Sequence, residues 1–269
     1  MIVENDFALK IIATEARSGS LVGISQQKRR CRRGVDKMKK QPFMIEEIPA
    51  LLWGENSEQL YLFVHGKMSC KEEAAGFAQI AVARGYQVLS FDLPEHGERK
   101  GKTDVTFDIW NGIHDLHIIM NYVEKHWKNV SLFACSIGAY FSLMTYAEKS
   151  FSKCLFLSPI VDMKQLIEDM MKWYSVSEEE LQAQGIIDTP MGEKLDWLYY
   201  RYVVEHPVGS WLSPTMILYG SADNLMSQET IQAFVEKHGA ELTVLEGGEH
   251  WFHTEEQIAF LEKWLNERV

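Results

Sequence analysis

Val130–Ala139, VSLFACSIGA, is the stretch from which the fold can be inferred, because a short apolar run leads into a serine between small residues and then into helical spacing. A serine on a sharp strand-to-helix turn has its hydroxyl pushed out of the sheet, and its neighbours must be small for the backbone to turn. The backbone N–H of Ile137 would point at an anion above Ser136. Taken alone, the stretch fits a structural turn as well as a catalytic one.

Strands and helices alternate on both sides of this stretch. Apolar runs of strand length cover Ile45–Trp53, Gln59–Val64, Tyr86–Phe91, Lys153–Leu157, Thr215–Tyr219 and Glu241–Leu245. Helical spacing covers Glu72–Arg84, the segment containing Leu116–Trp127, Ile137–Lys149, Gln228–His238 and Glu255–Arg268. Apolar strands separated by helices are typical of a parallel sheet covered on both faces. We therefore expect an α/β fold with a doubly wound, mostly parallel sheet.

One interval, residues 160–214, interrupts this alternation. It contains no strand-like run but many aromatic residues and methionines, and Ser177 with Glu180 fits a capping box. We expect a short, mostly helical cap insertion that lies over one end of the sheet. A second capping box, Thr254 with Gln257, is predicted to open the last helix.

Residues 1–44 differ from the rest of the chain in charge. They hold ten Lys and Arg against four Asp and Glu, whereas residues 45–269 hold 17 against 34. Such a leader could bind nucleic acid or an anionic membrane, or it could be an unpacked extension. It has no interleaved aromatic residues for base stacking, and the acidic remainder would repel phosphates. We therefore expect an unpacked leader, no nucleic-acid partner, and a folded domain at 45–269.

The composition excludes several classes of protein. With 269 residues, 46% hydrophobic and 24% charged, the chain is typical of a globular protein. No apolar run approaches the roughly 18–20 residues of a membrane span, and the first residues lack the pattern of a signal peptide. The four cysteines have neither a CxxC pair nor ligand-like spacing, so we expect no metal site, no disulfide framework and a cytoplasmic location.

Three more predicted strands end in residues of types that catalysis uses. In open parallel sheets, ligands bind beyond the carboxyl ends of the strands. The sequence His65-Gly66-Lys67 follows one strand, and the N–H of Lys67 could supply a second donor to an oxyanion. A hydrogen-bonded histidine at a structural turn would give the same pattern.

Asp223 and His250 follow the last two predicted strands. Asp223 could orient an imidazole, and His250, after two glycines, could act as a general base. Asp223 would equally fit an Asx turn or a helix cap, and His253 could replace His250 as the base.

The order Ser136, Asp223, His250 on successive strand ends is that of α/β-hydrolases, and residues 45–269 resemble this family. The stretch FDLPEHGER at Phe91–Arg99 is similar to the family's D-x-x-x-H-G segment, and we interpret Asp92, His96 and Gly97 in it as loop architecture. The chain looks most like small bacterial carboxylesterases and monoacylglycerol-lipase-like hydrolases with a short cap.

Two residues depart from the family pattern. Ala134 takes the place of the first glycine of the serine turn, and Lys67 stands where an apolar residue is commoner.

The resemblance implies a serine hydrolase acting on a small-molecule ester. His250 would take the proton of Ser136, and Asp223 would fix the histidine tautomer. The N–H groups of Ile137 and Lys67 would form the oxyanion hole. Water would then hydrolyse the acyl-serine, and neither a metal nor a cofactor is required.

We expect the insertion to select the substrate. The aromatic side chains predicted to contact the substrate are those of Trp173, Tyr174, Trp197, Trp211 and Trp251. An apolar pocket suits small or medium acyl or aryl groups. A serine peptidase and a thioesterase of the same fold are alternatives, as is a binding module without catalysis.

Overall fold

The computed structural model describes residues 38–102, 105–190 and 192–269. Most of the predicted basic leader, residues 1–37, lies outside the described residues. The described residues form two compact units. Met163–Pro207 belongs to one; the described residues up to Asp162, together with Val208–Val269, form the other, which we call the body.

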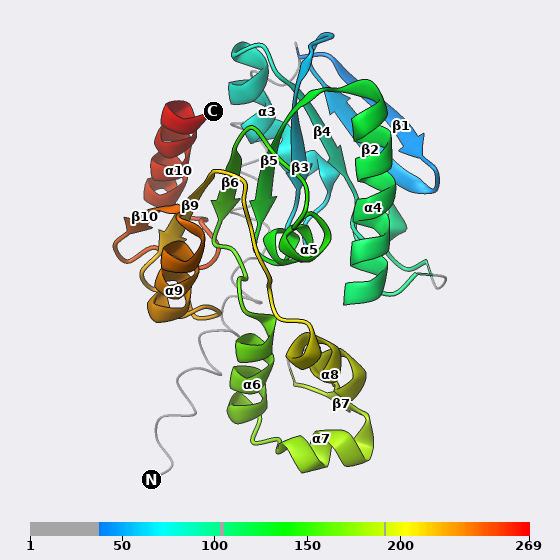
Figure 1. Ribbon diagram of the computed structural model, residues 1–269, viewed down its shortest axis with the longest axis vertical. Coiled ribbons are helices and arrows are strands. Elements are labelled where there is room, and N and C mark those ends of the chain that lie inside the picture. Colours follow the sequence, from blue (N-terminus) through cyan, green and yellow to red (C-terminus); the bar gives the residue numbers. More distant parts are fainter. Residues whose placement is uncertain (1–37, 103–104, 191) are drawn as a thin grey trace. The chain divides into compact units, whose positions relative to one another are not determined.

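The body contains an eight-stranded sheet in the described residues, with the order β1-β2-β4-β3-β5-β6-β9-β10 (Figure 1). From β4 to β10 all neighbouring strands are parallel, and β1 and β2 are antiparallel to their neighbours. The strands are β1 (Lys40–Ile45), β2 (Ile48–Trp53), β3 (Gln59–Val64), β4 (Gln87–Phe91), β5 (Asn129–Cys135), β6 (Cys154–Leu157), β9 (Thr215–Gly220) and β10 (Glu241–Leu245). The mostly parallel sheet predicted from the sequence is confirmed.

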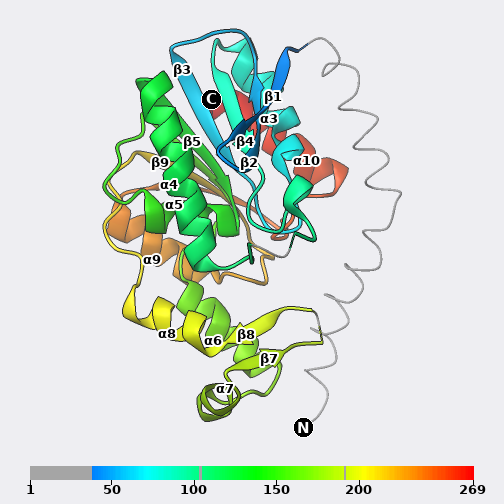
Figure 2. The ribbon, with the colours of Figure 1, turned by 90° about the vertical axis from the view of Figure 1, so that its right-hand side faces the viewer.

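Helices cover both faces of this sheet. Figure 2 shows α4 and α5 on one face and α3 and α10 on the other. Helices of the body are α3 (Ala74–Ala83), α4 (Ile109–His126), α5 (Ile137–Thr145), α9 (Gln228–His238) and α10 (Glu255–Arg268), with 3₁₀ turns η1 (Lys71–Glu73) and η2 (Gly97–Arg99). The predicted capping box of Thr254 and Gln257 is present at the start of α10. The fold is therefore doubly wound, as expected.

The first two strands correct the sequence analysis, which placed one strand at Ile45–Trp53 and ended the leader at residue 44. Lys40–Ile45 forms β1 and pairs with β2 through a tight turn, in which Glu46 has φ 52°. The prediction was wrong because β1 is an edge strand whose residues are mostly exposed, and its only consecutive apolar residues are the three at its end, Phe43 to Ile45. Lys40 and Pro42 are typical of edge strands that avoid pairing with another chain.

The unit formed by Met163–Pro207 is mostly helical, as the sequence predicts. It contains α6 (Met163–Trp173), α7 (Glu178–Gln184) and α8 (Trp197–Glu205). Ser177 caps α7 by accepting a hydrogen bond from the Glu180 N–H at 3.1 Å. Two three-residue strands, β7 (Ile186–Asp188) and β8 (Lys194–Asp196), form an antiparallel ribbon that the sequence analysis missed. Strands this short are below the length at which an alternating pattern can be recognised.

Candidate active site

Ser136 lies on the turn between β5 and α5, with φ 51° and ψ −121°. Positive φ in a residue other than glycine costs about 1–3 kcal/mol and is kept only where the surroundings enforce it. Here the Ser136 N–H donates to the carbonyl of Leu157 at 3.0 Å, and the Ser136 carbonyl accepts from the Ile160 N–H at 3.2 Å. Bonds on both sides of the residue therefore hold the serine turn in its strained conformation.

The small residues around Ser136 allow α5 to begin against the end of β3. A Cβ at Gly138 would lie 2.4 Å from the carbonyl oxygen of His65 and 2.8 Å from that of Val64. A Cβ at Gly66 would lie 3.3 Å from the Cβ of Ser136. The departure at Ala134 is accommodated, because this residue pairs with both neighbouring strands and its methyl group is buried.

Three side chains from three strand ends form a continuous hydrogen-bonded chain. Ser136 Oγ lies 2.8 Å from His250 Nε2, and His250 Nδ1 lies 2.7 Å from Asp223 Oδ2. The side chain of Asp223 is fully buried, and its second oxygen accepts from the N–H groups of Leu225 and Met226 at 2.8 and 3.2 Å. The structure brings together the three residues that the sequence singled out, with the imidazole between hydroxyl and carboxylate.

His253, the alternative base, has other partners. Its Nδ1 lies 2.9 Å from the carbonyl oxygen of Trp251 and 3.2 Å from Glu249 Oε2. The histidine that contacts Ser136 is therefore His250.

The loops that carry Asp223 and His250 are bonded to each other. The Ala222 N–H donates to the carbonyl of Gly248 at 2.8 Å, and the Gly247 N–H donates to Ser221 Oγ at 2.8 Å. A Cβ at Gly220 would lie 2.2 Å from the Gly248 carbonyl oxygen, so only glycine permits this approach. The separation of acid and base is thus set by backbone contacts.

Ile137 and Lys67 are the predicted oxyanion donors. Ile137 is the first residue of α5, where the N–H has no intrahelical acceptor. Lys67 lies on the loop after β3, and its ammonium is 5.4 Å from the centre of the Phe107 ring. The next residue, Met68, donates its N–H to His96 Nε2 at 3.0 Å.

The segment similar to D-x-x-x-H-G forms the architecture of the neighbouring loop. Buried Asp92 accepts hydrogen bonds from the Lys71 N–H and ammonium, both at 2.8 Å, and from the Glu98 N–H at 3.0 Å. A Cβ at Gly97 would lie 2.1 Å from Asp92 Oδ1, which explains the glycine. These contacts agree with the interpretation of this segment as structural.

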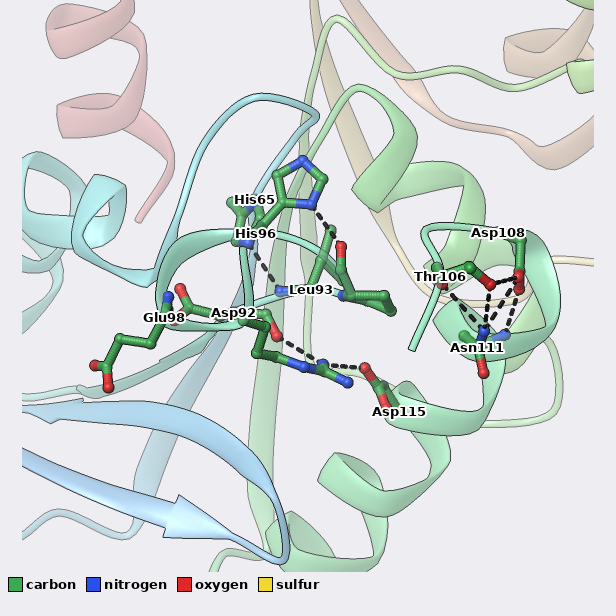
Figure 3. A network of polar contacts seen from close by, with 11 residues as sticks. His65, Asp92, Leu93, His96, Glu98, Thr106, Asp108, Asn111 and Asp115 are labelled. Atoms are coloured by element: carbon green, nitrogen blue, oxygen red, sulfur yellow. Dashed lines mark hydrogen bonds and ion pairs between the residues drawn. The ribbon is translucent and has the colours of Figure 1, made fainter. Parts of the chain in front are cut away.

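Two buried ion pairs in this region were missed by the sequence analysis. Burial by itself lowers the pKa of Lys71, but its hydrogen bonds to Asp92 and Glu98 raise it, and the net shift is upward. Arg99 pairs with Asp115 of α4 and also donates to the carbonyl of Asp92 (Figure 3). Isolated charged residues in a sequence carry no periodic signal that would identify such pairs.

Cys135, directly before Ser136, is a free thiol. Burial raises its pKa to about 12, and the charges of Glu73 and Asp223 act in the same direction. The nucleophilic form of cysteine is the thiolate, and the raised pKa disfavours that form at neutral pH. Ser136 is the nucleophile candidate at this turn.

Trp211, predicted to contact substrate, is instead part of the core of the body. It is only 3% exposed, its indole N–H donates to Thr215 Oγ1 at 2.7 Å, and it packs against Phe151 and Phe156. The ring is therefore buried among partners within the body, and the prediction for Trp211 was wrong.

The other four aromatic residues are at least partly accessible. Trp251, next to His250, is 53% exposed and stacks on His253. Trp173, Tyr174 and Trp197 are half-buried within the unit Met163–Pro207. Their contact with substrate stays a prediction.

Among the residues that the structure describes, no group of three or more His, Cys, Asp and Glu side chains is arranged to hold a metal ion. None of the helices in the described part of the chain combines the length and apolar character needed to cross a membrane.

Comparison with known proteins gives the family. The sequence profile of the alpha/beta hydrolase family matches residues 61–263. No functionally curated protein sequence matches the chain.

Solved structures share the fold at low sequence identity. Est1E from Butyrivibrio proteoclasticus, solved with ferulic acid, has a TM-score of 0.69 at 17% identity, over 84% of this chain and 96% of that one. The Pyrococcus furiosus esterase Pf2001 has a TM-score of 0.61 at 20% identity, over 86% and 88%. Mouse alpha/beta hydrolase domain-containing protein 10 has a TM-score of 0.65 at 12% identity, over 85% and 97%. Since the profile spans most of the chain, this protein belongs to the alpha/beta hydrolase family.

Proposed function

We propose that the protein is a serine hydrolase that cleaves carboxylic esters of small or medium apolar acyl or aryl groups. The observation that carries this proposal is the hydrogen-bonded chain from Ser136 through His250 to buried Asp223. An unactivated serine hydroxyl is a weak nucleophile at neutral pH, and an adjacent imidazole oriented by a carboxylate is the usual means of activating it.

In this mechanism Ser136 Oγ attacks the ester carbonyl while its proton moves to His250 Nε2. The negative charge on the carbonyl oxygen is stabilised by the N–H groups of Ile137 and Lys67. His250 then gives the proton to the leaving alcohol, and the acyl group stays on Ser136. Water attacks the acyl carbon and loses a proton to His250, which passes that proton to Ser136 Oγ as the bond between Oγ and the acyl carbon breaks and the acid leaves. Asp223 remains ionised and stabilises the imidazolium throughout.

The preference for apolar acyl groups is supported by side chains that flank these residues. Met68, next to the donor Lys67, is 91% exposed, and Trp251 follows His250. Exposed apolar side chains beside a polar reactive group favour a substrate with an apolar portion.

The test combines covalent labelling with a substrate series. A fluorophosphonate should label the wild type at Ser136, and Ser136→Ala should abolish both labelling and ester hydrolysis. Exposed Ser152 provides a matched control, and Ser152→Ala should behave as the wild type. Failure of a folded wild type to label would favour the binding module.

The substrate series then separates the enzymatic alternatives. We expect kcat/KM to rise severalfold from acetate to butyrate p-nitrophenyl esters, because each buried methylene contributes at most about 0.8 kcal/mol. Faster cleavage of leucyl-anilide than of any ester would indicate a peptidase. Faster cleavage of acyl-CoA would indicate a thioesterase.

A further inference from the structure

We infer that His96 is a positioning residue for the oxyanion hole, because its imidazole accepts the N–H of Met68 and so fixes the backbone that follows Lys67. The inference rests on the proposed function, since it assigns a role in the same reaction to a residue that touches no reacting atom. From the sequence alone, His96 was interpreted as a structural residue of its loop. The structure shows which backbone group it holds, the N–H of Met68.

Met68, on the loop after β3, is held at its backbone rather than by its side chain. Met68 has φ 61°, a backbone conformation that residues other than glycine rarely adopt, and its side chain is 91% exposed. Packing of the Met68 side chain therefore does not hold the residue in place. Its N–H donates to His96 Nε2 at 3.0 Å. This bond sets the orientation of the peptide between Lys67 and Met68, and thereby constrains the Lys67 backbone whose own N–H is the proposed donor.

The His96 ring is itself held in one tautomer and one orientation. Its Nδ1 lies 2.7 Å from the carbonyl oxygen of Pro94, so that nitrogen carries the proton and Nε2 is free to accept. The His96 and Phe107 rings pack edge to face, with the ring centres 4.7 Å apart. Figure 3 shows His96 bonded within its own loop and lying beside His65.

His65 makes the reciprocal connection between the same two loops. Its Nδ1 lies 2.7 Å from the carbonyl oxygen of Gly66, and its Nε2 accepts from the Leu93 N–H at 3.0 Å (Figure 3). The two imidazole rings are 5.3 Å apart. Each loop thus supplies an imidazole that binds a backbone N–H of the other, and together the two histidines fasten the loop after β3 to the loop after β4.

Both histidines must be neutral to accept these hydrogen bonds, because a protonated imidazole only donates. Burial lowers the pKa of His65 to about 4, and it also lowers the pKa of His96. Around His96, the charge of Lys67 lowers the pKa in the same direction as burial, whereas the hydrogen bond to Pro94 and the charges of Asp92 and Glu95 oppose this shift. The surroundings thus favour the accepting form.

The test uses two amide side chains of different reach. The longer side chain of His96→Gln can place an acceptor near the former Nε2, whereas that of His96→Asn ends near the former Nδ1. Loss of one oxyanion donor typically lowers kcat by 10²–10³. Because His96→Asn only loosens that donor, we expect kcat to fall about 10–100-fold with KM changed less than twofold. His96→Gln should stay within about threefold of the wild type.

A matched control and a second readout separate positioning from general damage. His117 is exposed on α4, and His117→Asn should leave kcat unchanged. A trifluoromethyl ketone that adds to Ser136 forms an oxyanion, so its affinity should weaken in His96→Asn in proportion to kcat/KM. Equal kcat in the Asn and Gln variants, or a loss that appears only in KM, would overturn the inference.

Amide exchange of Met68 in the wild type tests the hydrogen bond even where His96→Asn does not fold. We expect protection of this N–H in the wild type and in His96→Gln, and rapid exchange in the wild type would refute the connection. A wild type that neither reacts with fluorophosphonate nor hydrolyses esters would instead refute the proposed function. The two failures are therefore distinguishable.

Discussion

Gly138→Ala is the substitution that most directly tests how the serine turn is built. The added methyl group would lie 2.4 Å from the carbonyl oxygen of His65, 2.8 Å from that of Val64 and 3.0 Å from a side-chain carbon of Val64. The two closest atoms belong to the backbone of β3 and its loop, so no change of side-chain rotamer relieves the overlap. Either α5 or the loop after β3 must move.

The size of the effect follows from this geometry. Overpacking of a well-packed region typically costs 1–3 kcal/mol, and the rigid backbone here favours the upper half, about 2–3 kcal/mol. At about 2–4 °C per kcal/mol for a domain of this size, Tm should fall by roughly 5–10 °C. A displacement of about 1 Å at reacting atoms can cost 10²-fold in rate, so kcat should fall by a similar factor.

Gly76→Ala is the matched control. Gly76 is exposed in α3, and a Cβ there would have nothing within 4 Å. Alanine in a helix is favoured over glycine by roughly 0.5–1 kcal/mol, so Tm should rise slightly and kcat should not change. Thermal unfolding followed by circular dichroism, together with p-nitrophenyl butyrate turnover, measures both effects. A Gly138→Ala variant with wild-type Tm and kcat would show that Gly138 does not lie as close to the carbonyl groups of Val64 and His65 as the structure indicates.

Three further predictions concern single residues. Asp223→Asn should lower kcat by up to about 10⁴-fold, because the amide favours the wrong tautomer of His250; ester turnover measures this, and a loss below tenfold would contradict the role of Asp223. Burial lowers the pKa of His65 from 6.5 to about 4, so between these pH values the unfolded chain binds a proton that the folded chain does not. The free energy of unfolding should therefore be unaffected by His65 above about pH 6.5 and should fall by up to about 3 kcal/mol towards pH 4. Urea unfolding at several pH values checks this, and equal stability at pH 7 and pH 4.5 would count against it. Trp211→Ala should cost about 3–5 kcal/mol of stability while leaving KM of the folded enzyme unchanged; a changed KM with normal Tm would restore the substrate-binding role that the sequence predicted.

The fold and the three candidate catalytic residues could be predicted because local sequence patterns indicate them. The apolar run before Ser136 and the small residues around it indicate a strand and a sharp turn, and both are present. Asp223 and His250 could be placed beside Ser136 because the carboxyl ends of parallel strands meet at one edge of a sheet. The choice of His250 over His253 needed the structure, since both histidines follow the same strand.

Edge position and burial explain what the sequence did not predict. β1 was missed because an exposed edge strand needs no apolar face. Trp211 was assigned to substrate because an aromatic residue in a helical insertion looks the same whether it packs on Phe151 or lines a pocket. Lys71 is among the largest fully buried side chains, yet only the positions of Asp92 and Glu98 explain how its charge is stabilised.

There is a physical reason why candidate side-chain groups could be predicted from the sequence while the support of the backbone donors could not. A catalytic acid or base has to be one of a few side-chain types, so residue type and position after a strand make Asp223 and His250 candidates. A backbone N–H looks identical in every residue except proline, so a donor such as that of Lys67 is defined by what holds its peptide in place. In this chain, part of that support comes from His96 through a bond to Met68. Residues that position backbone donors therefore have to be sought among buried imidazole, amide and carboxylate groups whose bonds go to loop N–H groups rather than to substrate.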